Sequence, residues 1–344
     1  MNLTELTKKL TSLPGPSGFE DEVREFIADY AAPFADEIST DNMGNLLVLK
    51  RAKQTKKKRQ NRVDNETAPS RLFAAHMDEV GLIVTHSKDG GYYGFDCLGG
   101  IDKRVLPGKR VLIGGSKVPA VIGLPSIHLA DTGARDKVPE VSAMSLDAFG
   151  DTGVEAGTYA VFDSDWVEFG KGFVKAKALD DRIGCAVMLK LLELDLSEDT
   201  WFAFTVQEEA GCRGAAAAAN RLNCDRAYVI ETTTAADIPS KSGGDRVCEL
   251  TKGAVLPFMD GRTIYSRELW NENTLLADKH NITWQTKTRI AGGTDAGTIQ
   301  NSGAGCKVAA ISVPARNLHS PATVINLEDL DAVYEICKHI ASGK

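Results

Sequence analysis

The chain has 344 residues, of which 43% are hydrophobic and 25% are charged, and its formal net charge is −7. This composition is typical of a globular protein with enough apolar material for a sizeable core, in one large domain or two moderate ones. The acidic balance argues against a nucleic-acid-binding protein, which normally presents a basic face.

The N-terminal residues lack the uninterrupted apolar run of a secretory leader. No window approaches the roughly 18 consecutive apolar residues that a membrane-spanning helix needs. The seven cysteines are scattered, odd in number and without a CxxC pair, which argues against both a disulfide framework and a thiolate zinc site. We therefore expect a soluble cytoplasmic protein with no membrane partner.

The first part of the chain predicts two helices and two strands. Leucines recur at helical spacing over residues 3–10 before a Pro-Gly-Pro break, and apolar residues again share one face over residues 20–30. Short apolar runs at residues 45–49 and 71–75 are typical of strands. Between them, residues 50–70 carry a basic run without interleaved aromatic residues, which favours a solvated loop over a nucleic-acid or membrane contact.

The composition and periodicity of the sequence change twice after residue 78. Residues 79–171 are rich in glycine, valine and turn dipeptides without a long helical period, which predicts a small β-rich module. Strands and helices alternate from residue 172 onward, which predicts an α/β sheet layered by helices. We expect helices at residues 183–194, 213–222, 263–279 and 327–340, and strands at residues 173–179, 201–206, 227–230 and 307–313. Residues 1–78 and 172–344 thus form one predicted domain, interrupted by residues 79–171.

Polar groups that can bind a metal follow five of the expected strands. They are His76-Met77-Asp78, Asp180-Asp181, Glu208-Glu209, Glu231 and His319. Taken singly, each has an ordinary structural explanation, because paired acids often begin a helix and a lone histidine is often structural. Strand ends from distant parts of an open α/β sheet converge in one crevice, however, so the ordered set predicts a shared site.

Crowded carboxylates require a counter-charge. Six acids in one crevice would repel one another, and several would protonate rather than stay ionised. Divalent cations relieve this repulsion, and a set of carboxylates with two imidazoles suits Zn or Co first, with Mn or Mg also acceptable. A bridging carboxylate can hold two ions roughly 3.5–4 Å apart, the spacing that serves a hydrolytic water and a scissile carbonyl. We therefore expect two divalent cations in each chain.

The assembled motifs resemble the family of tetrahedral, deblocking and glutamyl aminopeptidases, dinuclear metallopeptidases of which some members were formerly labelled endoglucanases. The matching segments run in the family's order across nearly the whole chain. They are AAHMDEVG (74–81), ALDDRIG (178–184), QEEAGCRGA (207–215), GGTDAG (292–297) and PARNLHSP (314–321). The resemblance implies a phosphorylase/hydrolase-like zinc peptidase core, a mixed sheet layered by helices, with an inserted β-rich oligomerisation domain.

The resemblance also implies a role for each residue. Its metal ligands would be His76, Asp180, Glu209, Glu231 and His319. Asp180 would bridge the two ions, with His76 and Glu231 completing the first site and Glu209 and His319 the second.

Three further residues would act beside the ligands. Glu208 would be the general base that takes a proton from the bridging water, Asp78 would orient His76, and Asp181 would set the geometry of Asp180. Glu231 stands where many members of the family have Asp. Peptides would be the substrates, and the chain would assemble into homo-oligomers built of dimers, commonly dodecamers.

Two other functions compete with this interpretation. A glycoside hydrolase would use two carboxylates as acid and nucleophile or base, which leaves His76 and His319 without a role. A non-catalytic, metal-stabilised peptide-binding protein would be expected to have lost a ligand or the base, and all of them are present. The sequence therefore favours a metal-dependent aminopeptidase.

Overall fold

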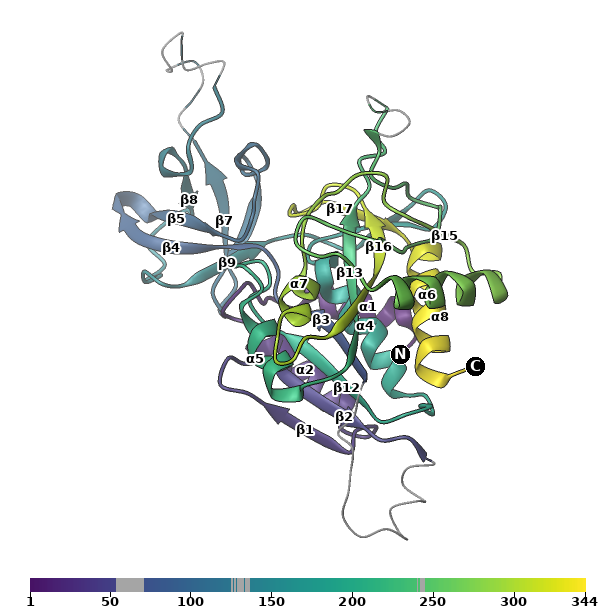
Figure 1. Ribbon diagram of the computed structural model, residues 1–344. Helices are drawn as coiled ribbons and strands as arrows, with labels where there is room; N and C mark the ends of the chain where they lie inside the picture. The colour runs from purple at the N-terminus through teal and green to yellow at the C-terminus, as the bar shows by residue number, and fades with distance from the viewer. Residues whose placement is uncertain are drawn as a thin grey trace.

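The computed structural model describes residues 1–53, 71–124, 126, 128, 133, 137–239, 241 and 245–344. An eight-stranded mixed sheet lies at the centre of the larger part (Figure 1). Its four middle strands are parallel to one another, and the strand that flanks them on each side is antiparallel to them. In spatial order the strands are β1 (Glu37–Thr40), β2 (Leu46–Lys50), β12 (Thr200–Thr205), β3 (Arg71–His76), β13 (Arg226–Thr234), β16 (Lys307–Ala315), β14 (Ala254–Val255) and β15 (Trp284–Gln285).

Helices cover both faces of this sheet, so its central strands are buried on both sides. In β3, Phe73 and Ala75 pack into one apolar cluster while Leu72 and Ala74 pack into the other, as the two-residue period of a strand requires. The helices of the first cluster are α1 (Leu3–Ser12), α2 (Asp21–Ala31), α4 (Leu179–Leu192), α6 (Arg267–Lys279) and α8 (Leu327–Ser342). Those of the second are α5 (Arg213–Leu222) and α7 (Asp295–Gln300). Among the described residues, no helix combines the length and apolarity needed to cross a bilayer.

A closed barrel with its own apolar core stands to one side of the sheet (Figure 1). Its strands lie within residues 79–171, for which the sequence predicts a β-rich module. They are β4 (Gly81–Lys88), β5 (Tyr92–Leu98), β6 (Arg110–Ile113), β7 (Val118–Gly123), β8 (Ser145–Asp147) and β9 (Tyr159–Phe162). A small three-stranded sheet of β10 (Val167–Phe169), β11 (Phe173–Ala176) and β17 (Thr323–Asn326) follows the barrel in the chain.

Several boundaries differ from the sequence prediction, among them those of β13, α6 and the strand before α4. Strand β13 runs beyond residue 230 to Thr234, because it stays paired with β16 over its full length. Helix α6 begins at Arg267 rather than at residue 263, because the side chain of Ser266 accepts the Leu269 amide and caps the helix there. The loop expected at residues 50–70 lies outside the described residues from residue 54 onward.

The third difference concerns the segment before α4. The strand expected at residues 173–179 ends at Ala176 and belongs to the three-stranded sheet, not to the main sheet. Asp180 and Asp181 therefore lie in the first turn of α4. They reach the carboxyl edge of the main sheet from a helix that packs on β3 and β13, and not from the end of a neighbouring strand.

A buried cation, Arg182, ties this helix to the segments around it. Its guanidinium is fully buried and donates hydrogen bonds to the carbonyls of Met77 at 2.6 Å and Leu10 at 2.7 Å. The buried carboxylate of Glu79 accepts from Lys177 at 2.6 Å and lies 3.4 Å from Arg182. Removing such a group leaves buried acceptors without a donor, which costs far more than losing a surface ion pair.

We predict that Arg182→Met lowers the free energy of unfolding by about 3–5 kcal/mol, the cost of breaking a buried ion pair. Denaturant unfolding of the purified variant measures this change. Arg104→Met is the matched control, because Arg104 pairs with Asp102 at the exposed surface and its loss should change the free energy of unfolding far less. Equal losses in the two variants would contradict the structural role of Arg182.

Candidate metal centre

The polar side chains predicted from the sequence meet at the carboxyl edge of the main sheet. Helix α4 and the ends of the parallel strands supply them. They are His76 at the end of β3, Asp78 just beyond it, Asp180 and Asp181 in α4, Glu208 and Glu209 after β12, Glu231 within β13, and His319 after β16. The structure thus brings together all of the residues that the sequence singles out.

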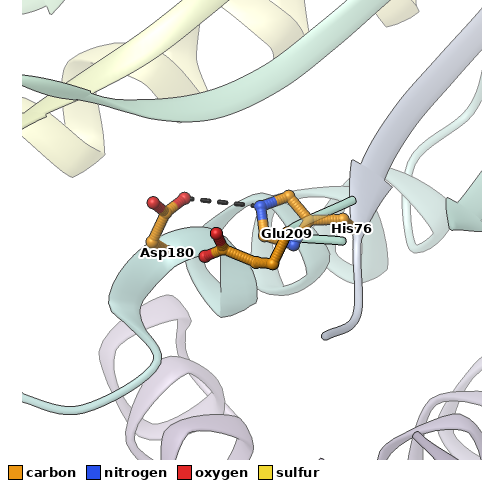
Figure 2. Close-up of side chains that lie close together, drawn as sticks. All are labelled: His76, Asp180 and Glu209. Carbon is orange, nitrogen blue, oxygen red and sulfur yellow. Dashed lines mark ion pairs between the residues drawn. The ribbon is translucent and has the colours of Figure 1, made fainter. Parts of the chain in front are cut away.

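The carboxylate of Asp180 lies between the two histidines. Its Oδ1 is 3.4 Å from Nε2 of His76, and its Oδ2 is 3.6 Å from Nε2 of His319. Figure 2 shows the Asp180 carboxylate directed toward the His76 ring, with the Glu209 carboxylate beside it. Glu209 Oε2 is also 3.3 Å from His319 Nε2. One carboxylate that offers a separate oxygen to each of two imidazoles has the arrangement of a bridging ligand.

Both imidazoles are held so that Nε2 faces these carboxylates. His319 Nδ1 lies 2.8 Å from the carbonyl of Gly100, which can only accept, so Nδ1 carries the proton and donates. His76 Nδ1 faces Asp78, at 3.1 Å from its carbonyl and 3.4 Å from Oδ1. With Nδ1 engaged, Nε2 is the nitrogen of each ring that faces the carboxylates, which is how a second group orients a metal-binding histidine.

Asp78 also holds the loop that carries the two glutamates. Its two carboxylate oxygens accept the backbone amides of Glu208 and Glu209 at 3.0 and 3.1 Å, and Ser17 donates to it at 2.5 Å. Burial opposes the ionisation of Asp78, but the hydrogen bonds from His76, Ser17 and the Glu208 amide outweigh it. The pKa of Asp78 is therefore held below its ordinary value.

Asp181 lies with Glu231 and His76 in a second group of possible ligands. One ligand atom of each residue lies within 4.8 Å of the others. Asp181 is fully buried, and its Oδ1 accepts the Gly184 amide at 3.1 Å. A Cβ at Gly184 would overlap the Asp181 carboxylate, so this position needs a glycine. The motif ALDDRIG thus contains both acids, Asp180 and Asp181, and the glycine that leaves room for the Asp181 carboxylate.

The acids of this centre are too crowded to ionise together. Burial raises the pKa of Glu209 to about 8, and the negative charge of Asp180 adds to the effect. Burial also raises the pKa values of Glu208, Asp181 and Glu231, the last two well above the ordinary range. Asp180 differs, because contacts with both histidines outweigh its burial and lower its pKa.

The same donor set fits divalent cations. In the part of the chain that the structure describes, Asp181 Oδ2 and Glu231 Oε1 are buried without a hydrogen-bond partner. Asp180 Oδ1 has none beyond the His76 ring nitrogen. Buried carboxylate oxygens without donors are costly unless a cation satisfies them. Imidazole nitrogens and carboxylate oxygens are ligands that Zn, Co and Mn accept.

Comparison with known proteins agrees with this centre. Residues 59–336 match the M42 glutamyl aminopeptidase family. The chain belongs to this family. A glutamyl aminopeptidase of Lactococcus lactis is 30% identical over 347 residues, covering 96% of this chain and 93% of the relative.

Two solved structures share the fold over almost their full length. An aminopeptidase from the archaeon Desulfurococcus kamchatkensis is 32% identical with a TM-score of 0.90, covering 99% of this chain and 95% of that one. The TET1 peptidase of Pyrococcus horikoshii is 31% identical with a TM-score of 0.84, and the likeness covers 100% of both chains. The mixed α/β fold and the aminopeptidase family predicted from the sequence are confirmed. The protein is a peptide hydrolase of a metallopeptidase family.

Glu20 belongs to the surroundings of the site, although its place at the start of a predicted helix does not indicate this role. It is only 4% exposed, and its Oε1 accepts the amides of Gly18 at 2.7 Å and Gln207 at 3.1 Å. It therefore fixes the first residue of the loop that carries Glu208 and Glu209. Burial raises the pKa of Glu20 to about 7, and the charge of Asp78 adds to this.

We predict that Glu20→Gln makes this M42 peptidase more stable than wild type at pH 8 by roughly 1–3 kcal/mol, since one pKa unit corresponds to about 1.4 kcal/mol. The folded state keeps the Glu20 proton up to about pH 7, whereas the unfolded chain loses it near the ordinary glutamate pKa of 4.5. Stability from this group is therefore lost as pH rises between these values. At pH 5 the variant and wild type should differ much less.

Denaturant unfolding at pH 5 and pH 8 checks this pH dependence. Glu25→Gln is the matched control, because Glu25 is an exposed acid on the same helix, α2. It should change the free energy of unfolding little at either pH. A Glu20→Gln variant that is no more stable than wild type at pH 8 would argue against a buried, protonated Glu20.

Proposed function

We propose that this M42 peptidase removes N-terminal residues from peptides with two divalent cations and with Glu208 as the general base. The position of Asp180 carries the proposal, because its two oxygens face Nε2 of His76 and Nε2 of His319 separately. A carboxylate that served only to neutralise one histidine would not need a second imidazole on its other oxygen. A shared pair of cations accounts for both contacts.

The ligands divide into two sets around Asp180. His76, Asp180 and Glu231 hold the first ion, with His76 Nε2 at 3.8 Å from Glu231 Oε2. Asp180, Glu209 and His319 hold the second. Zn and Co suit this mixture of imidazole and carboxylate best, and Mn or Mg are also acceptable. Asp181 is held behind the first set by the Gly184 amide and supports the geometry of Asp180.

When bound, the two cations polarise the scissile carbonyl and lower the pKa of the attacking water. The protein itself supplies the proton transfer. The Glu208 carboxylate accepts the proton of the water and passes it to the amine of the leaving peptide. Burial raises the pKa of Glu208, which brings this carboxyl closer to the range in which one group can both accept and return a proton near neutrality.

A glycosidase function receives less support from the same residues. It would need a pair of carboxylates set apart across a sugar bond as acid and nucleophile or base. The carboxylates instead surround two imidazoles whose Nδ1 atoms are engaged elsewhere. A passive peptide-binding role gives no reason for the partly buried Glu208 beside that set.

We further propose that residues 1–78 and 172–344 form the catalytic domain and that residues 79–171 form an inserted β-rich domain through which the chain assembles. The barrel exposes large apolar side chains, including Phe149 at 75% and Tyr92 at 42% exposure. Exposed apolar groups gathered on one part of a protein favour protein contacts. The TET1 peptidase is described as able to assemble into a tetrahedron or a large octahedral shell. A homo-oligomer built of dimers, up to a dodecamer, follows for this chain.

We expect Glu208→Gln to bind the same number of metal ions as wild type and to lose about 10²–10⁴-fold in kcat, because the amide cannot accept a proton. Aminoacyl-chromophore substrates, assayed after chelation and reloading with Zn or Co, give the rate, and elemental analysis gives the metal content. Near-normal turnover of the variant would refute the role of Glu208. Cleavage of glucan that survives chelation would support the glycosidase instead.

Size-exclusion chromatography with light scattering tests the assembly at micromolar concentration. We expect a species several times the 37.0 kDa mass of one chain. Phe149→Glu should shift the population toward smaller species, because it buries a charge in the proposed contact. Ile264→Glu is the control, since Ile264 is as exposed but lies outside the barrel. A wild-type chain that elutes only as a monomer would overturn the proposal.

A further inference from the structure

A second polar cluster adjoins the site and includes Glu208, and the proposed hydrolysis does not use its other members. Cys212 Sγ donates to Glu208 Oε1 at 3.3 Å, and Arg262 Nη1 donates to the same sulfur at 2.9 Å. Asp295 completes the group, because one ligand atom each of Glu208, Cys212 and Asp295 lies within 4.8 Å of the others. A thiol thus lies between a carboxylate and a guanidinium, next to a second buried carboxylate.

Asp295 carries the observation that points to a ligand. It is 1% exposed, and its Oδ2 accepts the hydroxyl of Thr205 at 2.6 Å. Its Oδ1 is buried and has no hydrogen-bond partner among the residues that the structure describes. A carboxylate oxygen without a donor is costly in this setting, and burial raises the pKa of Asp295 to about 7. A bound cation would satisfy this oxygen without a proton.

The surrounding residues hold the cluster in place. The side chain of Arg262 passes over Gly293, where a Cβ would overlap its methylene groups. Thr294 caps α7 by accepting the amide of Ala296, which fixes the start of the helix at Asp295. The glycines and the Thr-Asp pair of GGTDAG therefore make room for Arg262 and place Asp295, and they form no phosphate loop.

The charges of the cluster match a divalent cation. Fully ionised, Glu208, Asp295 and Cys212 carry three negative charges, and Arg262 offsets one of them. The remaining two equal the charge of one divalent ion. Donors about 2.0–2.3 Å from one zinc ion are at most about 4.6 Å apart, and here the three ligand atoms lie within 4.8 Å of one another, with Cys212 Sγ 3.3 Å from Glu208 Oε1. A thiolate among carboxylates favours Zn or Cd over harder ions such as Mg.

We propose that Glu208, Cys212 and Asp295 form a separate site for a thiophilic divalent cation, such as Zn²⁺ or Cd²⁺, that binds in excess of the catalytic pair. On binding, the thiol proton leaves to solvent and the sulfur joins the ion as thiolate. Arg262 keeps its hydrogen bond to that sulfur. An ion bound to Glu208 occupies the lone pair that accepts the proton of water, so filling this site inhibits hydrolysis. This inhibition rests on the proposed function.

Equilibrium dialysis of the metal-loaded enzyme against excess Zn²⁺, followed by elemental analysis, tests the site. Wild type should retain one more ion per chain than Cys212→Ser and than Asp295→Asn. The test compares the number of ions bound by wild type with the number bound by each variant. This difference is informative whether the catalytic centre holds two ions or another number. The result therefore stays separate from any failure of the proposed catalytic roles.

Cadmium gives an independent spectroscopic test. Wild type should show an ultraviolet sulfur-to-cadmium charge-transfer band that disappears in Cys212→Ser and persists in Cys306→Ala, a control at a partly exposed cysteine. Asp295→Asn keeps the thiol and should weaken cadmium binding at least several-fold. An equal ion count and an equal band in wild type and Cys212→Ser would overturn the proposal. So would full cadmium binding by Asp295→Asn, since the orphaned carboxylate would then have no part in the site.

Discussion

The electrostatic cost of crowding carboxylates around two imidazoles dominates this structure. Asp180 lies between His76 and His319, and further buried acids surround it. Such a set stays ionised only with positive charge in its midst, since burial alone favours the protonated forms. The protein supplies part of that compensation through hydrogen bonds to Asp78, but none of the described residues donates to the buried Oδ2 of Asp181 or Oε1 of Glu231. The fold around the centre therefore has to hold groups that repel one another.

Strained backbone conformations occur at the segments that hold the crowded acids in place. Ala178, Gln207, Cys212 and His319 are not glycines, yet each has a φ between 53° and 56°. Left-handed backbone at such residues costs of order 1–3 kcal/mol each and persists only where packing and hydrogen bonds determine it. Each of them belongs to the candidate metal centre or to the Glu208–Cys212–Asp295 cluster, or lies within two residues of a member. They lie in the segments before α4, after β12 and after β16. The buried pair of Arg182 and Glu79 joins the same region, because Arg182 donates to the carbonyl of Met77, next to His76 and Asp78.

The sequence predicted which residues meet in the centre better than it predicted which helices and strands carry them. His76, Glu208 and Glu209 follow parallel strands, so the rule that strand ends converge placed them correctly. The same rule misassigned Asp180 and Asp181, which arrive on α4, and it placed Glu231 after a strand that in fact continues through it. Glu20 and Asp295 could not be recognised, because their roles come from contacts with segments more than 80 residues away. No local pattern encodes such pairs.

The barrel also takes part in the centre, which limits how independent the two parts of the chain can be. The carbonyl of Gly100, from the segment between β5 and β6, fixes the tautomer of His319. Val80 and Phe162 line the same small pocket as Asp180, Glu209 and His319. Any shift of the barrel against the sheet would therefore move the acceptor that orients one imidazole. A contact made on the barrel's outer surface has a short physical path to His319, through Gly100 and one hydrogen bond.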